Sequence, residues 1–446
     1  MSRRTTRQAS QAAIAVTKEA GIEANGNMES ASRVPKAKAT KRKAVKAVVE
    51  EDERETETAV AKDEAKPKKR KTTKDKAEDA VPLAERTAIS SLKKSMYIGA
   101  HVSSAGGVHN SINNAIHIGA NSFALFLKSQ RKWANPPITP EARDQFRALS
   151  HAHGFEAHKH CVPHGSYLVN LAQSDKTKAD QAYTAFLDDL QRCESLGIKL
   201  YNFHPGNSNG EDRAEAIQRI ATQLNRSHKA TSTVITLLEN MAGQGNVIGS
   251  TFEDLRDIIE KIDDKSRVGV CIDTCHAFAA GYDLRSPEAF KETFDKLDKA
   301  VGLKYVKALH LNDSKAPFDS NRDLHANIGT GFLGLRAFHN VMNYEPLQHL
   351  PMVLETPIDR KGPDGKTIED KQVWADEIKL LESLIGMDPE SDEFKAHDRR
   401  LQAQGAGERS KVQDQVDRKA EKDAKKGKGK GRGKKKAAPS DEDESE

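Results

Sequence analysis

The chain has 446 residues, of which 31% are charged and 36% hydrophobic, and its formal net charge is +5. It contains no run of 18 or more apolar residues, which excludes a membrane-spanning helix within this sequence. Its four cysteines are too few for a disulfide framework and include no CxxC pair. We therefore expect a protein of a reducing compartment, with no membrane partner.

The two ends of the chain differ in composition from its middle. Residues 1–95 and 391–446 are rich in Lys, Arg, Glu, Ala and Ser and nearly free of aromatic residues. Such segments cannot bury enough apolar surface to offset the entropy of ordering, so we expect two disordered, charged tails. Basic runs occur in them at 35–46, 66–71 and 425–436, the last with eight Lys or Arg in twelve positions. Runs of this kind serve as nuclear-import signals or nucleic-acid patches, although a merely solvated tail would look the same.

The middle of the chain, residues 96–390, alternates strand and helix patterns. Short, almost continuously apolar runs predict buried strands at 96–101, 123–128, 155–164, 199–204, 234–240, 268–273, 306–312 and 351–356. Amphipathic patterns between them predict helices at 140–152, 178–196, 212–228, 252–262, 287–300, 332–343 and 371–385. Pro140 and Pro287 suit first helical turns, and Gly197 suits a helix end.

This alternation decides the fold class. Eight strand-helix units predict an α/β protein with a single (β/α)8 TIM barrel, and a central stretch of roughly 300 residues suits that fold. A doubly wound sheet would have fewer strands and could not bring six strand ends around one pocket. Neither a GxGxxG motif before a helix nor a GxxxxGK[ST] motif is present, so no nucleotide cofactor is expected.

Six of the predicted strands run directly into a side chain that can bind a metal ion. These residues are His164, His204, Glu239, Asp273, His310 and Glu355. Three further candidates are His276, Asp323 and His325. Because the strands of a barrel end at one face, we expect all nine side chains to share one pocket. Imidazoles and carboxylates suit zinc or manganese in a catalytic cluster.

Several alternatives bear on this constellation. A single His or Asp at a strand end is more often structural than a ligand, so the prediction rests on recurrence at six strand ends. Cys271 and Cys275 flank Asp273, but buried strand thiols are the simpler interpretation. His101, at the end of the first strand, fits a place near the pocket and a structural role equally well. A second hypothesis is a sugar isomerase or epimerase, because such barrels also carry Glu, Asp and His at their strand ends. A third is an inactive, chromatin-binding barrel, which the complete ligand set disfavours.

Six blocks of sequence resemble one enzyme family. They are GAHVSSAGG (99–107), PHGSYLVNL (163–171), NFHPG (202–206), ENMAGQG (239–245), GVCIDTCHAFAAGYDL (269–284) and HLNDSK (310–315). Together they resemble endonuclease IV, a family of metal-dependent apurinic/apyrimidinic endonucleases of base-excision repair. The resemblance covers about residues 96–386 and neither tail. It implies hydrolysis of the phosphodiester 5′ to an abasic site, leaving a 3′-hydroxyl and a 5′-deoxyribose phosphate, and 3′-phosphodiesterase activity on blocked 3′ ends.

The resemblance also implies how the nine residues are shared among three Zn²⁺ ions, one of which Mn²⁺ could replace. One ion would take His164, His204 and Glu239. A second would share Glu239 and take Asp273, His310 and Glu355. A third would take His276, Asp323 and His325. Glu239, as the bridging carboxylate, and Glu355, which could orient or deprotonate the attacking water, are the expected catalytic residues.

Two loops match the family's DNA-inserting loops. Gln130 and Arg131 follow the second predicted strand, and Tyr167 and Leu168 follow the third. The resemblance implies that these four residues contact DNA, since an abasic sugar that is flipped out leaves a gap for side chains to fill. The alternative for Tyr167 and Leu168 is a place in the core, and Trp133 is expected to pack under its loop.

The expected partners and location follow from these inferences. Damaged double-stranded DNA is the expected substrate, and the basic tails are expected to engage the nuclear import machinery and to bind DNA without sequence preference. We expect a monomer in the nucleus. The first 18 residues carry four basic residues and no acid, which leaves the mitochondrion as a second compartment.

Overall fold

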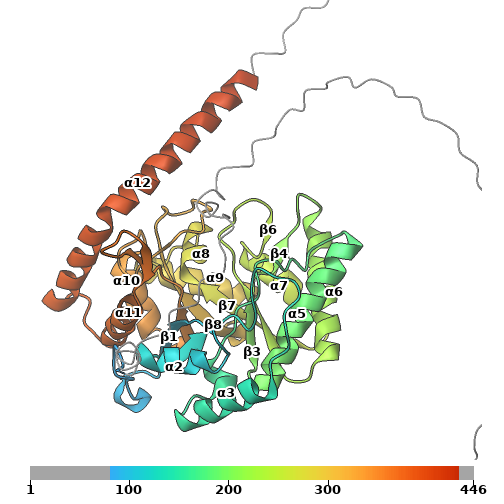
Figure 1. Ribbon diagram of the computed structural model, residues 1–446. Coiled ribbons are helices and arrows are strands. Elements are labelled where there is room, and N and C mark those ends of the chain that lie inside the picture. Colours follow the sequence, from blue (N-terminus) through green and yellow to red (C-terminus); the bar gives the residue numbers. More distant parts are fainter. Residues whose placement is uncertain (1–80, 431–446) are drawn as a thin grey trace, which may run out of the picture. The chain divides into compact units, whose positions relative to one another are not determined.

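The computed structural model describes residues 81–430, with side chains for residues 81–422 (Figure 1). Its centre is a parallel sheet of seven strands in the order β2-β1-β11-β8-β7-β5-β3. The strands are β1 (Tyr97–His101), β2 (Ser122–Ala124), β3 (Leu200–Phe203), β5 (Ile235–Glu239), β7 (Val268–Asp273), β8 (Val306–Leu311) and β11 (Pro351–Leu354). Seven of the eight predicted strands are therefore confirmed.

The remaining predicted strand, 155–164, is wrong over its first half. Its first part forms the short helix α4 (Ala157–His160), since Glu156, His158 and Lys159 are too polar for a strand buried on both faces. Residues 161–164 are extended and lie between the two edge strands. Isolated parallel bridges join Phe123 to Cys161 and His164 to Asn202. This segment therefore closes the sheet into the predicted TIM barrel.

Helices follow the strands and surround the sheet. All seven predicted helices are present, as α3 (Pro140–Ala152), α5 (Lys176–Leu196), α6 (Arg213–Ala230), α7 (Phe252–Glu260), α9 (Pro287–Ala300), α10 (Gly334–Asn343) and α11 (Gln372–Ser383). Pro140 and Pro287 lie in the first turns of α3 and α9, and Gly197, with a φ of 78°, ends α5. Besides α4 and the C-terminal helix described below, the sequence patterns miss α2 (Asn110–His117) and α8 (Thr274–Ala279). The first is rich in Asn and the second is only six residues long.

Side chains fill the interior of the barrel below its C-terminal mouth. A small cluster of buried residues there has one member from each of five successive positions around the sheet, namely Val162, Leu200, Leu237, Cys271 and Ala308. A larger cluster packs the outer face of the sheet against the helices. Because side chains alternate between the two faces of a strand, the residue two positions after an interior residue also points inward. Four of those residues are His164, Glu239, Asp273 and His310.

Short antiparallel strand pairs lie in the loops at the C-terminal ends of the barrel strands. They pair β4 (Gly206–Asn207) with β6 (Val247–Ile248), β9 (Asp313–Ser314) with β10 (His325–Ala326), and β12 (Asp359–Lys361) with β13 (Thr367–Glu369). Single 3-10 turns occur at η1 (Ile89–Ser91), η2 (Lys265–Arg267), η3 (Leu303–Tyr305) and η4 (Glu345–Leu347). These strand pairs form the rim around the mouth of the barrel.

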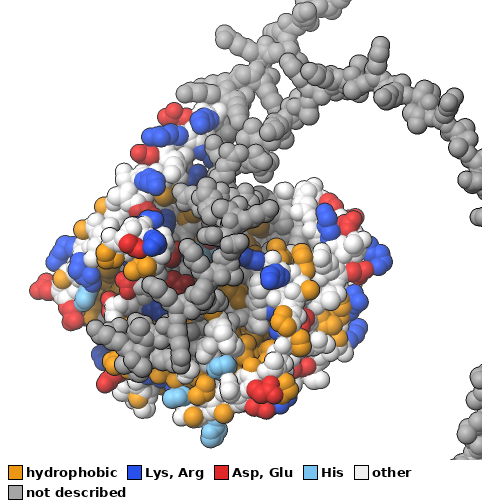
Figure 2. Space-filling model, viewed as in Figure 1, with side chains coloured by type: hydrophobic (Ala, Val, Ile, Leu, Met, Phe, Trp, Pro, Cys, Tyr) orange, Lys and Arg blue, Asp and Glu red, His pale blue; other side chains and the backbone are white. Residues whose placement is uncertain are grey.

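Disorder was predicted for residues 1–95 and 391–446, but the structure describes residues 81–95 and a helix from Asp392 onward. Residues from 81 onward are placed, and Arg86 binds Asn121 and the carbonyl of His153. At the other end, α12 (Asp392–Lys430) is a helix where disorder was predicted from residue 391. Figure 2 shows acidic and basic side chains interspersed along α12. Its buried contacts come from a few residues spaced along one face, Phe394, Leu401 and Val412, too sparse to register in an argument from composition.

The rest of the two tails, including the basic runs at 35–46 and 66–71, lies outside the described residues. Within the described part of the chain, no helix is both long and apolar enough to cross a membrane.

Candidate metal centre

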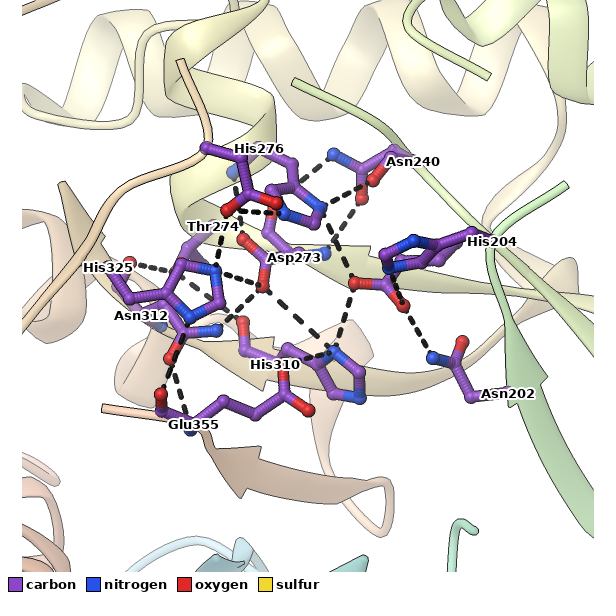
Figure 3. A network of polar contacts seen from close by, with 12 residues as sticks. Asn202, His204, Asn240, Asp273, Thr274, His276, His310, Asn312, His325 and Glu355 are labelled. Carbon is purple, nitrogen blue, oxygen red and sulfur yellow. Dashed lines mark hydrogen bonds and ion pairs between the residues drawn. The ribbon is translucent and has the colours of Figure 1, made fainter. Parts of the chain in front are cut away.

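All nine predicted metal-binding residues meet at the C-terminal mouth of the barrel. Figure 3 shows the imidazoles of His204, His276, His310 and His325 and the carboxylates of Asp273 and Glu355 directed at a common region. Their ligand atoms fall into sets whose members lie within 4.8 Å of one another. Three of these sets are His164, His204 and Glu239; Glu239, Asp273, His310 and Glu355; and His276, Asp323 and His325.

Glu239 joins the first two sets. This fully buried residue ends β5, and its two carboxylate oxygens face in different directions. Oε2 lies 3.2 Å from Nε2 of His164 and 3.5 Å from Nε2 of His204. Oε1 lies 3.1 Å from Nδ1 of His310. One oxygen for each set is the arrangement that a carboxylate bridging two cations requires.

The other carboxylates complete the second and third sets. Glu355, after β11, places Oε2 at 3.2 Å from Nδ1 of His310. Asp323 lies in the loop before β10, and its Oδ1 is 3.1 Å from Nε2 of His276 and 3.2 Å from Nε2 of His325. The first two sets therefore come mainly from strand ends, whereas the third comes from α8 and a loop.

The ligand atoms of the third set are arranged to bind a cation rather than to form hydrogen bonds with one another. Nε2 of His276 and Nε2 of His325 are buried and have no hydrogen-bond partner among the described residues, although Asp323 lies within 3.2 Å of each. Two ring nitrogens and a carboxylate oxygen that crowd together without hydrogen-bond geometry are directed at a shared point. Such N and O donors suit zinc and related divalent ions.

Burial and neighbouring imidazoles shift the pKa values of the carboxylates in the cluster in opposite directions. Burial by itself would raise the pKa of Glu239, but the imidazoles of His310 and His204 lower it well below its ordinary value. Burial would likewise raise the pKa of Glu355, and His310 and His101 lower it instead. Burial lowers the pKa of His204 to about 4, so its ring is neutral at pH 7 and free to bind a metal.

Comparison with known proteins agrees with this geometry. Residues 112–384 match the family described as xylose isomerase-like TIM barrel. Apurinic-apyrimidinic endonuclease 1 of Saccharomyces cerevisiae is 46% identical over 305 residues, covering 68% of this chain and 79% of the yeast protein. A probable endonuclease 4 of Campylobacter curvus is 47% identical over 289 residues, covering 65% of this chain and 98% of the bacterial one. The crystal structure of endonuclease IV from Thermus thermophilus matches with a TM-score of 0.55 at 30% identity, over 65% of this chain and 99% of that one.

The chain belongs to the endonuclease IV family. It is accordingly a nuclease, an enzyme that hydrolyses phosphodiester bonds. The resemblance seen in the sequence blocks and the predicted barrel are both confirmed.

Buried asparagines orient the ligands of this endonuclease IV site, and sequence reasoning missed them. Asn202 donates to Oε2 of Glu239 at 2.5 Å, and Asn312 donates to Oδ2 of Asp273 at 2.6 Å. Asn240 accepts from the amide of Asp273 at 2.7 Å. These residues lie within two positions of a ligand in an apolar strand, and a buried amide in such a run is the signal that could have identified them.

Backbone carbonyls fix two of the imidazoles. Nδ1 of His164 lies 2.7 Å from the carbonyl oxygen of Gly165, and Nδ1 of His276 lies 2.9 Å from that of Asn240. A ring that donates through Nδ1 leaves Nε2 unprotonated when the imidazole is neutral. Both rings therefore present the nitrogen that faces the ligand sets.

His101 belongs to the site, which resolves the two roles left open by the sequence. Its Nδ1 lies 3.0 Å from Oε1 of Glu355, the oxygen that does not face His310. Its ring packs against Phe126 at 4.5 Å between centroids. His101 therefore holds the outer oxygen of Glu355 while the other oxygen faces the second ligand set.

Cys271 is the predicted buried strand thiol, whereas Cys275 is buried but lies in α8 rather than in a strand. All four are buried. Cys275 lies near Asp273 and His325, and its Sγ is 3.7 Å from the carbonyl oxygen of Leu324. Burial raises the pKa of the Cys275 thiol well above its ordinary value, which keeps it protonated and a poor ligand.

The two loops expected to contact DNA lie side by side at the mouth. Ser166 donates to the carbonyl of Gln130 at 3.0 Å, which joins them. Tyr167 is 59% exposed and Leu168 39% exposed, so neither has the core position that was the alternative. The ring of Tyr167 lies 5.2 Å from that of His164, directly beside the ligands. Trp133, expected to pack under its loop, is instead 38% exposed.

Proposed function

We propose that this protein is a zinc-dependent apurinic/apyrimidinic endonuclease of base-excision repair. It would hydrolyse the phosphodiester 5′ to an abasic site and remove blocking groups from 3′ ends. The observation that carries the proposal is the placement of Glu239, whose two oxygens face two separate ligand sets. The name of the yeast relative, apurinic-apyrimidinic endonuclease 1, supports abasic DNA as the substrate.

Three Zn²⁺ ions, with Mn²⁺ able to occupy one place, are the proposed cofactors. The first ion would be held by His164 and His204, the second by Asp273, His310 and Glu355, with Glu239 shared between them. The third would be held by His276, Asp323 and His325. When bound, such ions stabilise charge on phosphodiester oxygens and lower the pKa of water toward neutrality.

The side chains around this centre would orient the water and transfer its proton. Glu355 would orient the attacking water and accept its proton. The contacts of its two oxygens with His101 and His310, at 3.0 and 3.2 Å, support a fixed orientation of this carboxylate. Water adds to phosphorus, the bond from phosphorus to the 3′ oxygen breaks, and that oxygen leaves with a proton. The products are a 3′-hydroxyl and a 5′-deoxyribose phosphate.

The exposed loops supply lesion recognition in this proposal. Tyr167 and Leu168 project beside the ligands, and Arg131 and Gln130 lie on the loop bonded to theirs. A duplex that lacks one base can be opened at that position at low cost. Apolar and planar side chains would enter the gap and hold the abasic sugar over the metal centre.

The test is incubation of the purified protein with an end-labelled duplex that carries one abasic site, with and without prior chelation. We expect a single nick that leaves a 3′-hydroxyl, is lost on chelation and is restored by Zn²⁺. Failure of the fully metal-loaded protein to nick would overturn the proposal. It would direct attention to small sugars as substrates.

We also propose that the enzyme is a monomer in the nucleus, with the mitochondrion as a second compartment. The basic runs that motivate import lie outside the residues whose side chains the structure describes. Deleting residues 425–436 should lower affinity for all DNA sequences evenly, because phosphate contacts carry no sequence information. An unchanged salt dependence of binding would contradict a role of this run in DNA contact, and a fluorescent fusion that stays outside the nucleus would contradict the location.

A further inference from the structure

The third ligand set depends on one loop segment, residues 313–334, which we call the rim segment. It begins at β9, carries Asp323 and His325, and ends where α10 starts. No strand of the barrel sheet contributes to it. Among the described elements, only the two-residue pairing of β9 with β10 holds the ligand-bearing part in place by secondary structure.

The inner side of the rim segment is held by a buried carboxylate. Asp313 accepts hydrogen bonds from the backbone amides of Gly331 and Leu333, both at 2.9 Å, and from that of Gly334 at 3.3 Å. The side chain is fully buried. These bonds fold the end of the rim segment back over its beginning.

The outer side of the same loop is held by α12. Gln402 donates to the carbonyl oxygens of Gly329 and Gly331 at 2.8 and 3.0 Å. Arg409 donates to the carbonyl oxygen of Thr330, which lies between them. Three successive carbonyls of the rim segment are therefore bound by two side chains of one helix.

Further along, α12 reaches the residues next to the ligands. Glu408 pairs with Lys315 at 3.1 Å, and Gln415 accepts from Arg322 at 3.5 Å. Arg322 immediately precedes the ligand Asp323. The helix therefore contacts the rim segment on both sides of the ligand pair.

The fit between α12 and the rim segment requires a glycine. A Cβ on Gly405 would lie 1.8 Å from the carbonyl oxygen of Thr330, far inside van der Waals contact. Glycine is disfavoured in the interior of a helix, and the close approach of the loop accounts for it at this position. Gly407, on the same helix, has no atom of the described residues within 4 Å of its own Cβ position.

The helix lies outside the part of the chain that matches the family. The matching region ends at residue 384, whereas α12 begins at Asp392. The relative from Campylobacter curvus is covered over 98% of its length by 289 residues of this chain. The contact between α12 and the rim segment therefore lies beyond the C-terminal end of the family-model match.

We propose that α12 is a positioning element for the third ligand set, acting through Gln402, Arg409 and the close approach at Gly405. It holds the rim segment so that Asp323 and His325 stay directed at His276. This inference rests on the proposed function, since it assumes that the third set holds a metal ion. Its consequence is that displacing α12 releases that ion while the ions bound at the strand ends remain.

The experiment compares two full-length variants, Gly405→Ala and Gly407→Ala. Both add one methyl group to the same helix, but only the first drives it into Thr330. Metal content is measured by mass spectrometry after dialysis against graded concentrations of a weak chelator, without DNA. We expect Gly405→Ala to lose about one ion per chain at chelator concentrations about 10- to 100-fold lower than those required by the wild-type protein, the usual cost of disturbing the groups around metal ligands. We expect Gly407→Ala to match the wild-type protein.

A double variant, Gln402→Ala with Arg409→Ala, tests the same contact without adding volume. It should show the same selective loss of one ion. Identical metal retention by Gly405→Ala, the double variant and Gly407→Ala would overturn the proposal. So would loss of all ions together, because α12 would then support the whole barrel.

Hydrogen exchange separates this proposal from the proposed function. The amides of Gly331, Leu333 and Gly334 should exchange faster in Gly405→Ala than in Gly407→Ala, whether or not metal is present. If the wild-type protein binds no metal and the two variants still differ in exchange, the proposed function is contradicted and α12 remains the support of the rim segment. Equal exchange in the two variants would contradict the role of α12 itself.

Discussion

The ligands at the strand ends and the ligands on the rim segment are held in different ways. Glu239, Asp273 and His310 are the inward-facing residues of β5, β7 and β8, and they are fully buried. Asp323 and His325 belong to the rim segment, Asp323 in its loop and His325 in the two-residue strand β10, with side chains 31% and 21% exposed. The first group is fixed by the sheet itself, whereas the second depends on contacts from distant parts of the chain. The same metal centre therefore combines a rigid part and a part that can be displaced separately.

The largest effect should come from the residue that the two strand-end sets share. Glu239→Gln removes the negative charge between His164 and His310 while keeping the shape of the side chain. We expect kcat/KM on abasic duplex to fall roughly a thousandfold, because a metal centre supplies several kcal/mol of transition-state stabilisation. The measurement is the rate of nicking together with metal content. Glu345→Gln, with an exposed carboxylate, is the matched control, and near-normal activity of Glu239→Gln would show that the two sets do not act as one centre.

Metal removal should distinguish the two regions by stability. A site filled at 100 times its Kd contributes about 2.7 kcal/mol to the free energy of unfolding. Chelation should therefore lower Tm, and it should raise hydrogen exchange in residues 322–331 more than in β5 and β7. The Tm of Glu239→Gln should respond much less to chelation. Equal increases in exchange across both regions would contradict the division into a rigid and a displaceable part.

His101 should affect the strand-end region through Glu355. Its ring holds Oε1 of Glu355 at 3.0 Å, so His101→Ala should lower kcat about 10- to 100-fold with little change in KM. His101→Asn, which keeps a donor near the position of Nδ1, should recover part of the loss. Equal kcat values for the alanine variant and the wild-type protein would place His101 outside the mechanism.

The smallest effect should come from the exposed loops. Tyr167→Ala removes an aromatic side chain that is 59% exposed beside the ligands. We expect KM for abasic duplex to rise roughly fivefold, the equivalent of about 1 kcal/mol for a lost aromatic contact. The nicked product should be unchanged. A large fall in kcat with constant KM would instead indicate that Tyr167 shapes the metal centre through His164 and His204.

The ligands at the strand ends were easier to predict from the sequence than the ligands on the rim segment. The strand-end ligands were predictable because short apolar runs predict buried strands, and the C-terminal ends of barrel strands share one face. The grouping of Asp323 and His325 with His276 could be expected only from the family resemblance, since no local pattern places a loop. Residues 155–160 were misassigned because they were joined to the apolar residues Cys161–Pro163, although four of their own six side chains are polar.

The C-terminal error has a different physical cause. Composition groups residues 391–422 with disordered tails, because 15 of these 32 residues are charged. The helix is nevertheless held by a few residues that meet the barrel, chiefly Leu401, Gln402, Gly405 and Arg409. Those contacts join segments about 70 residues apart in the chain, and such long-range pairings leave no local signal in a sequence.

The closure of the barrel has a consequence for how the ring assembles. Residues 161–164 join β2 to β3 through two isolated bridges, whereas neighbouring strands elsewhere pair over three or more residues. Among the described strands of the ring, this seam has the fewest paired residues. We therefore expect the seam to open first and to form last. Because the ligand partners of His164 lie on β5 and β8, bound ions would act as a latch on that final joining step. Faster hydrogen exchange at Val162 and His164 than at the amides of β5 and β7, slowed on addition of Zn²⁺, is the signature of such a latch.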